Sequence, residues 1–149
     1  MIAAAELLEK EHDIGADIWS VTSFSELRRE ALAVERYNLL HPTEKPKESY
    51  VAQCLKTDDP VIAATDYIRL NADQIRNFVK QSYTVLGTDG YGRSDTREQL
   101  RNFFEVNRYY IVIAALKTLA DQGKLSLTKV AEAIKKYKIN PEKPDPVTV

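Results

Sequence analysis

The spacing of hydrophobic residues predicts where this chain forms helices and strands. In several long segments apolar residues recur every three or four positions, which is the period of one helix face. These segments are residues 1–11, 24–40, 66–79, 108–122 and 127–137. Shorter runs rich in β-branched and aromatic residues are typical of strands. They occupy residues 16–22, 61–65 and 83–87. Because strands and helices alternate, we expect an α/β fold with a mostly parallel sheet.

Polar residues and a glycine stand where these helices are expected to begin or end. Ser23 is followed three positions later by Glu26, which is the pattern of a capping box at a helix start. Asp66 and Asn107 are placed to cap two later helices. Gly15 follows the first helix, in a position where glycine often ends one.

The pattern predicts one domain, residues 1–138, followed by a proline-rich tail, residues 139–149, that is extended or loosely attached. Residues 41–60 form a long polar link with a short helical turn, and such links often lie against another domain or subunit. The first helical pattern already runs at Met1 without a capping residue. We therefore expect a fragment whose first helix was cut from a longer protein.

Composition narrows the class of protein. The chain has 149 residues, of which 44% are hydrophobic, enough to build a core. Its 22 acidic and 21 basic residues nearly balance, so nucleic acid and anionic membranes are not expected partners. The sequence shows no apolar run of bilayer length and no signal-peptide pattern. We expect a cytoplasmic protein.

Few side chains offer metal or nucleophile chemistry. The two histidines, His12 and His41, are far apart and match no metal-ligand spacing. Cys54 is the single cysteine, and no neighbouring positive charge would lower its pKa, so we expect it to fill the core. His41 follows a helix without a nearby nucleophile, and we expect it only to bond locally. No catalytic residue, cofactor ligand or metal ligand is predicted.

A glycine-rich stretch follows the last predicted strand, with glycines at positions 87, 90 and 92. It lacks the lysine and the spacing of a Walker loop, and Asp95 stands where a dinucleotide fingerprint needs its third glycine. An acid at a helix start repels phosphate, so Asp95 is better explained as an N-cap that forms a capping box with Glu98. The stretch is therefore predicted to be a tight turn from a strand into a helix.

Two interpretations remain for the exposed side chains of this turn. Tyr91, Arg93 and Arg97 are residue types favoured in protein interfaces. Alternatively, the two arginines form local ion pairs with Asp89 or Asp95.

Small polar residues follow each predicted strand. In parallel sheets ligands bind beyond the carboxyl ends of the strands, and Ser23, Asp66 and Asp89 would line such a crevice. The same residue types are also the usual caps of the helices that follow. Both roles stay open.

Four strings, in this order along the chain, resemble the C-terminal domain of the homodimeric bacterial pyruvate dehydrogenase (acetyl-transferring) family, within the transketolase superfamily. They are DIWSVTSFSELRRE, ERYNLLHPTE, TDYIRLNADQIR and LGTDGYGRSDTREQLRNFFEV. The resemblance implies a three-layer α/β/α fold whose first strand is missing from this fragment.

The resemblance also implies a function for the whole enzyme. Members decarboxylate pyruvate with thiamine diphosphate and Mg²⁺ and reductively acetylate lipoyl groups of the dihydrolipoyl acetyltransferase. The family's cofactor ligands and catalytic histidines lie in other domains, so the resemblance assigns this segment a structural, dimer-packing role. We expect the isolated fragment to be inactive. The alternative is a small-molecule or regulatory binding module that uses the strand-end crevice.

Overall fold

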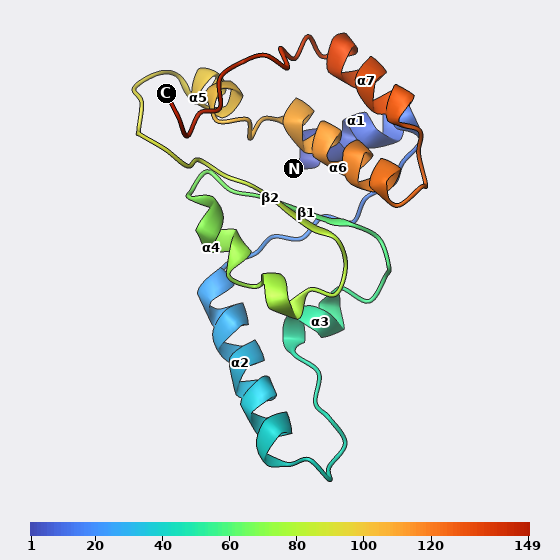
Figure 1. Cartoon of the computed structure of the whole chain (residues 1–149), viewed down its shortest axis with the longest axis vertical. Coiled ribbons are helices and arrows are strands. Elements are labelled where there is room, and N and C mark those ends of the chain that lie inside the picture. Colours follow the sequence, from blue (N-terminus) through green and yellow to red (C-terminus); the bar gives the residue numbers. More distant parts are fainter.

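A computed structural model describes residues 1–149 and shows a two-stranded parallel sheet between two layers of helices. Strand β1 (Val61–Ala64) pairs in register with β2 (Tyr83–Leu86), with Val61 opposite Tyr83. The three-layer α/β/α prediction is confirmed, with a sheet that is smaller than expected. Figure 1 shows the two layers on opposite sides of the sheet.

One layer holds the helices from the two ends of the chain. It consists of α1 (Ile2–His12), α6 (Arg108–Asp121) and α7 (Leu127–Lys136). The other layer holds the helices from the middle of the chain. It consists of α2 (Phe24–Leu40), α3 (Tyr50–Cys54), α4 (Arg69–Asp73) and the 3-10 helix η1 (Arg76–Phe78). Helix α5 (Arg97–Phe103) lies apart from the sheet, beside the C-terminus (Figure 1).

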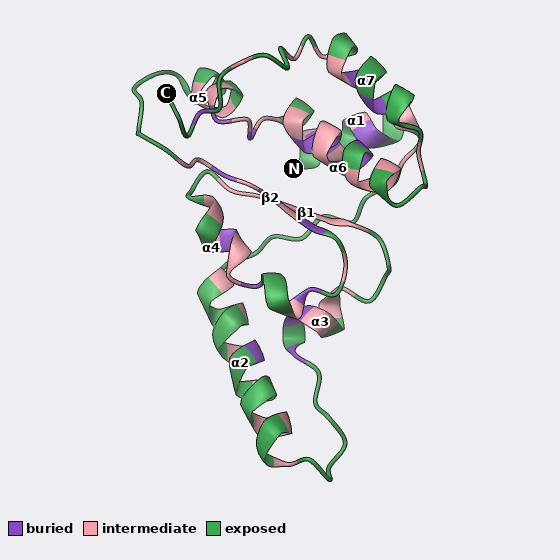
Figure 2. Cartoon of the chain, in the orientation of Figure 1, coloured by how far each residue is buried: buried purple, intermediate pink, exposed green.

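The sheet divides the interior into two hydrophobic cores (Figure 2). Ile62, Ala64 and Leu86 face the core built by α1, α6 and α7. Val61 and Ala63 alternate with them and face the core of the middle layer, as do Tyr83 and Val85. Successive side chains of a strand point to opposite faces, so each short strand contributes to both cores.

Helix α6 is the centre of the first core. Four of its residues are buried, and Val112 and Leu116 are completely shielded from solvent. The helix begins where predicted, because the Asn107 side chain accepts hydrogen bonds from the backbone N–H groups of Tyr109 and Tyr110. Gly123, with φ of 73°, follows its last turn.

The prediction of a strand over residues 16–22 is wrong. The segment has no regular secondary structure, and its backbone N–H and C=O groups form no hydrogen bond with a strand. Ile18, Trp19 and Val21 remain 41% to 55% exposed. A sequence with strand character needs a neighbouring strand to pair with, and the described sheet contains only β1 and β2.

The single helix predicted over residues 66–79 is also wrong. Helix α4 begins at Arg69 without a side-chain cap, so Asp66 does not cap it. The hydroxyl of Tyr83 donates a hydrogen bond of 2.8 Å to the backbone carbonyl of Ala72. That carbonyl would accept the bond from residue 76 in a continuous helix, and the chain instead passes into η1 after Gln74.

Helix ends differ from the predictions in two further details. Asp13, with φ of 56°, takes the left-handed position after α1 that was assigned to Gly15. The apolar spacing of residues 127–137 places Leu127 on the inner face of the last helix, but in the structure it is the first residue of that helix and is 62% exposed. The Ser23 cap of α2 and the short helix within residues 41–60 are confirmed.

The tail is held against the domain. Pro146 is buried, and Lys143 contacts the end of α5. The tail was predicted to be extended or loosely attached, and these contacts contradict loose attachment. None of the helices is both long and apolar enough to cross a bilayer.

We expect the first core to dominate stability. Leu116→Ala should lower the free energy of unfolding by about 3 kcal/mol, because it opens a cavity at a fully buried position. The matched control Leu127→Ala removes the same atoms from an exposed site and should cost less than about 0.5 kcal/mol. Urea denaturation followed by circular dichroism measures both, and equal losses would contradict this core.

Candidate functional site

The carboxyl ends of β1 and β2 carry two loops that are joined by hydrogen bonds. The backbone N–H of Thr88 donates to the carbonyl of Tyr67 at 2.9 Å, and the Thr88 hydroxyl donates to the carbonyl of Asp66 at 3.3 Å. The backbone N–H of Arg69 donates to Oδ1 of Asp89 at 2.8 Å. The strand-end region is thus a closed joint between the two loops.

Gly87 makes this joint possible. A Cβ atom at this position would lie 2.8 Å from both the backbone nitrogen of Arg69 and the carbonyl oxygen of Tyr67. Gly87 is therefore required for space, whereas Gly90, with φ of 97°, is required for its left-handed backbone. The close approach leaves no room for a phosphate between the loops at Gly87.

The three side chains predicted to line a crevice are all engaged within the chain. Ser23 accepts a hydrogen bond from the backbone N–H of Glu26 and caps α2. Asp89 accepts from Arg69, whose Nε also lies 3.6 Å from its second oxygen. Asp66 forms a two-point ion pair with Arg101, in which Nε donates at 2.9 Å.

The ion pair changes the titration of Asp66. Hydrogen bonding from the Arg101 guanidinium holds the pKa of the Asp66 carboxyl below its usual value, and the charges of Arg101 and Arg97 act in the same direction. Partial burial opposes this shift. Asp66 and Asp89 follow the paired strands β1 and β2, whereas Ser23 follows a segment that is not a strand.

The helix after the glycine stretch begins one residue later than predicted. Thr96 is the N-cap, and its hydroxyl accepts a hydrogen bond of 3.3 Å from the backbone N–H of Gln99. Asp95 instead accepts from the backbone N–H of Thr96 at 2.7 Å. The predicted capping box of Asp95 with Glu98 is therefore wrong, since threonine occupies the capping position.

The glycine loop, residues 87–96, presents the residues predicted for an interface. Tyr91 is 82% exposed. Arg93 places its guanidinium 4.4 Å from the centroid of the Phe103 ring, and Arg97 is the first residue of α5. Neither arginine lies within 4 Å of a carboxylate oxygen, so the alternative of local ion pairs with Asp89 or Asp95 is wrong. The interface itself stays a prediction.

The inner side of this loop and α5 enclose a surface hollow of about 480 Å³. Residues from the loop and from one face of α5 line it, including Gly92, Arg93, Asp95 and Phe103. A larger hollow of about 730 Å³ lies between α3 and the residues before β2. Its lining is polar and mixes Lys56 and Lys80 with acidic side chains, so it offers no single charge for a ligand.

The residues with candidate chemistry have structural partners. The ring of His41 donates from Nδ1 to the backbone carbonyl of Tyr37 and stacks on the Tyr37 ring, which confirms its local role. His12 lies 2.9 Å from the hydroxyl of Tyr137, and desolvation lowers the pKa of its imidazole. Cys54 is half-buried. No three His, Cys, Asp or Glu side chains are grouped to hold a metal ion.

Sequence reasoning missed three contributors to this region. Arg101 forms an ion pair with Asp66, which lies 35 positions earlier in the sequence. The Phe103 ring contacts the Arg93 guanidinium. Lys143, from the tail, donates a hydrogen bond to the end of α5. No periodicity connects such distant positions. The one local indication is the sequence REQLR at residues 97–101, whose charged residues are typical of an exposed helix.

The family model described as transketolase-like TK C-terminal domain matches residues 1–107, which is more than half of the chain. The chain belongs to the transketolase C-terminal domain family. The two-stranded sheet between helical layers is therefore part of a transketolase C-terminal-like domain, and the fold predicted from the resemblance is confirmed.

Relatives of this transketolase C-terminal domain carry the name pyruvate dehydrogenase E1 component. Those of Cupriavidus necator and Pseudomonas aeruginosa are each 60% identical, over 100% and 97% of this chain. The relative from Escherichia coli is 49% identical over 96% of the chain. The chain spans 16% to 17% of the length of these relatives. The predicted resemblance to this group is confirmed.

The implied thiamine diphosphate and Mg²⁺ do not fit the donors of this domain. Their ligands would have to be carboxylates near a loop that can approach a diphosphate closely. Asp66 and Asp89 already face arginines, and Gly87 is packed against backbone. No step of a reaction is therefore assigned to residues of this chain.

We expect Asp66→Asn to reduce stability only modestly. The Asp66 and Arg101 side chains are 58% and 42% exposed, so solvent screens their attraction and the loss at pH 7 should be below about 1 kcal/mol. Because the folded pKa of Asp66 is lowered, its contribution is present above the unfolded pKa and lost as pH falls through the folded one.

The difference between the native chain and Asp66→Asn should thus be constant from about pH 7 to pH 5 and shrink below about pH 4. Urea denaturation at these pH values measures it. Asp58→Asn, which removes a carboxylate without an ion pair, is the control and should leave stability nearly unchanged. A difference that grows on acidification would contradict the assignment.

Proposed function

We propose that this chain forms the C-terminal domain of a pyruvate dehydrogenase E1 component and serves there in structure and dimer packing. The observation that carries the proposal is the 60% identity to E1 components along the whole chain. The match covers 100% of this chain, so it supports a shared role and not only a shared fold.

In the proposed enzyme, thiamine diphosphate and Mg²⁺ support decarboxylation of pyruvate and reductive acetylation of lipoyl groups on the dihydrolipoyl acetyltransferase. The enzyme would be a cytoplasmic homodimer. The chemistry would belong to other parts of the polypeptide, because the acidic side chains at the strand ends here are neutralised by arginines. The domain would complete the subunit without touching the reacting atoms.

The glycine loop is the surface we assign to dimer packing. Tyr91 is 82% exposed, and Arg93 and Arg97 have no carboxylate partner within the chain. An arginine without an internal ion pair keeps all its donors for a partner, and tyrosine adds contact area at low entropic cost. A partner surface with carboxylates and an apolar pocket fits this combination.

The alternative of a ligand-binding crevice receives no support from the geometry. Ser23 caps α2, and Asp66 and Asp89 are satisfied by arginine side chains or backbone. A ligand would have to displace these contacts. We therefore do not propose it as the function.

A chimera tests the proposal. This chain would replace the matched C-terminal segment of the Pseudomonas aeruginosa E1 component, and we expect the chimera to release CO₂ from pyruvate with thiamine diphosphate and Mg²⁺. The isolated chain should release none under the same conditions, because it lacks cofactor ligands. Turnover by the isolated chain, or a folded dimeric chimera without activity, would overturn the proposal.

We expect Tyr91→Ala to weaken dimerisation of that chimera about tenfold or more, since it removes a large exposed contact. Analytical ultracentrifugation measures the dissociation constant. Tyr50→Ala removes a tyrosine of 58% exposure on α3, and it should leave the constant unchanged. Equal effects of the two substitutions would remove Tyr91 from the interface.

A further inference from the structure

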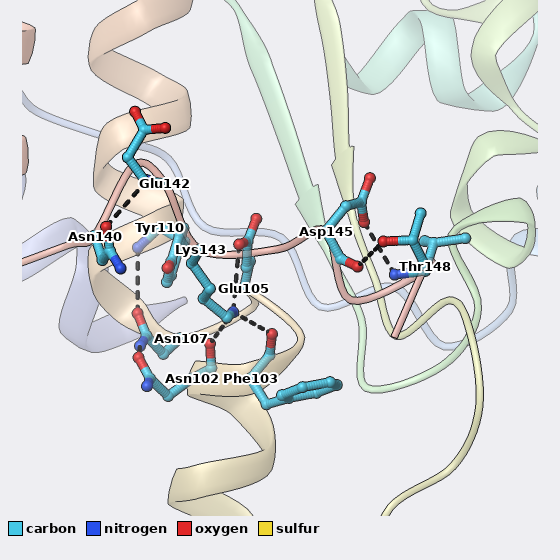
Figure 3. Close-up of polar contacts among 11 residues, drawn as sticks. Asn102, Phe103, Glu105, Asn107, Tyr110, Asn140, Glu142, Lys143, Asp145 and Thr148 are labelled. Atoms are coloured by element: carbon cyan, nitrogen blue, oxygen red, sulfur yellow. Dashed lines mark hydrogen bonds and ion pairs between the residues drawn. The ribbon is translucent and has the colours of Figure 1, made fainter.

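The C-terminal tail turns back over α5 and the glycine loop (Figure 3). We call residues 139–149 the strap. Its course is fixed by turns: the backbone N–H of Glu142 donates to the Asn140 side chain, and the N–H of Thr148 donates to the carbonyl of Asp145. Asp145 also accepts through Oδ1 from the backbone N–H of Val147. The strap therefore has a defined path across the domain.

Lys143 is the main contact between the strap and α5. Its ammonium donates to the backbone carbonyls of Asn102, at 3.2 Å, and of Phe103, and it lies 3.3 Å from Oε1 of Glu105 (Figure 3). The Lys143 side chain is only 22% exposed. Carbonyls at a helix C-terminus lack intrahelical partners and attract cations, so Lys143 closes the end of α5.

The same lysine is connected to the glycine loop through an aromatic ring. The Lys143 ammonium lies 5.3 Å from the centroid of the Phe103 ring, and the Arg93 guanidinium lies 4.4 Å from it. Cations are attracted to an aromatic ring by its quadrupole. Phe103 thus receives one cation from the strap and one from the loop, and its position affects both.

A second contact joins the strap to the loop directly. A Cβ atom at Gly90 would lie 2.8 Å from the carbonyl oxygen of Pro146 and 3.2 Å from the Cα of Val147. Pro146 is buried at this crossing. The loop backbone and the strap backbone are therefore in van der Waals contact, at a site only a glycine permits.

Helix α5 has little other support. It contains seven residues, none of them buried, and a helix this short is not stable by itself. Its side-chain contacts are the Thr96 cap, the Arg101 ion pair and Lys143, together with a hydrogen bond from Asn107 to Asn102 and the Arg93 guanidinium on the Phe103 ring. Backbone N–H groups bond the carbonyls of Leu100, Arg101 and Asn102, so loss of Lys143 would leave the carbonyl of Phe103 without its partner.

We propose that the strap is a conformational device in which Lys143 latches α5 and thereby holds the glycine loop in the position that displays Tyr91 and Arg93. Opening of the latch frees the loop while both hydrophobic cores stay folded. The idea that the latch controls contact with a partner rests on the proposed function. The idea that Lys143 holds α5 and the glycine loop in place does not. Neutralising Lys143 is sufficient to open it.

Limited trypsin digestion of the 149-residue chain tests the latch. Arg93 is exposed, but its guanidinium lies on the Phe103 ring, so trypsin should cut after it slowly in the native chain and faster once the loop is released. Lys143→Met keeps the length of the side chain and removes the charge, and it destroys no tryptic site because Pro144 follows. Since bonds to a charged group are lost, cleavage after Arg93 should become about tenfold faster.

Three comparisons complete the design. Lys135→Met removes an exposed lysine without an ion pair and should leave cleavage after Arg93 unchanged. A chain that ends at Ile139 should match Lys143→Met. Cleavage after Lys117, which lies within α6 and outside the strap and α5, reports general unfolding and should not change in any variant.

The result expected is therefore faster cleavage after Arg93 alone, in Lys143→Met and in the shortened chain. An unchanged rate after Arg93 in Lys143→Met overturns the latch, whatever the shortened chain shows. An equal increase after Arg93 and Lys117 also overturns it, because it reveals global destabilisation. Activity and oligomeric state do not enter this readout, so the latch and the proposed function fail separately.

Discussion

This domain depends on two four-residue strands. Each strand buries one face in one hydrophobic core and its opposite face in the other. Ile62 and Ala64 face α1, α6 and α7, whereas Val61 and Ala63 face the middle layer. A shift of register by one residue would exchange these faces and place the wrong volumes in both cores. The helices from the two ends of the chain are thus positioned by the same few backbone hydrogen bonds that position α3 and α4.

Local sequence was sufficient for the elements that carry their own signals. The Asn107 cap and the apolar face of α6, and the apolar runs of β1 and β2, predicted their positions closely. Residues 16–22 have the composition of a strand, but strand formation depends on a partner that sequence pattern cannot supply. The end of α4 could not be predicted from local sequence either. The hydroxyl that donates a hydrogen bond to the Ala72 carbonyl belongs to Tyr83, in the next strand.

The exposed residues of the candidate site could be predicted from the sequence. The contacts that hold these residues in position could not. Glycine spacing and the absence of a lysine excluded a phosphate loop, and Tyr91 is exposed as an interface residue must be. The contacts that shape the region join Asp66 to Arg101 and Phe103 to Lys143. Such pairs depend on how elements pack in three dimensions, so neither spacing nor composition indicates them. Gly87 was likewise interpreted only as part of a tight turn, whereas the structure requires it for a close backbone crossing.

The outer half of α2 extends away from both cores (Figure 1). Its end is fastened only to its own return loop, through bonds between Asn38 and Lys47 and the stacking of His41 on Tyr37. Leu39 is 78% exposed there. The outer half of α2 and its return loop are therefore stabilised independently of the sheet. Their tip can unfold locally and re-form while the rest of the domain remains folded. Changes of length or sequence at the tip are consequently the mildest that this domain can accommodate.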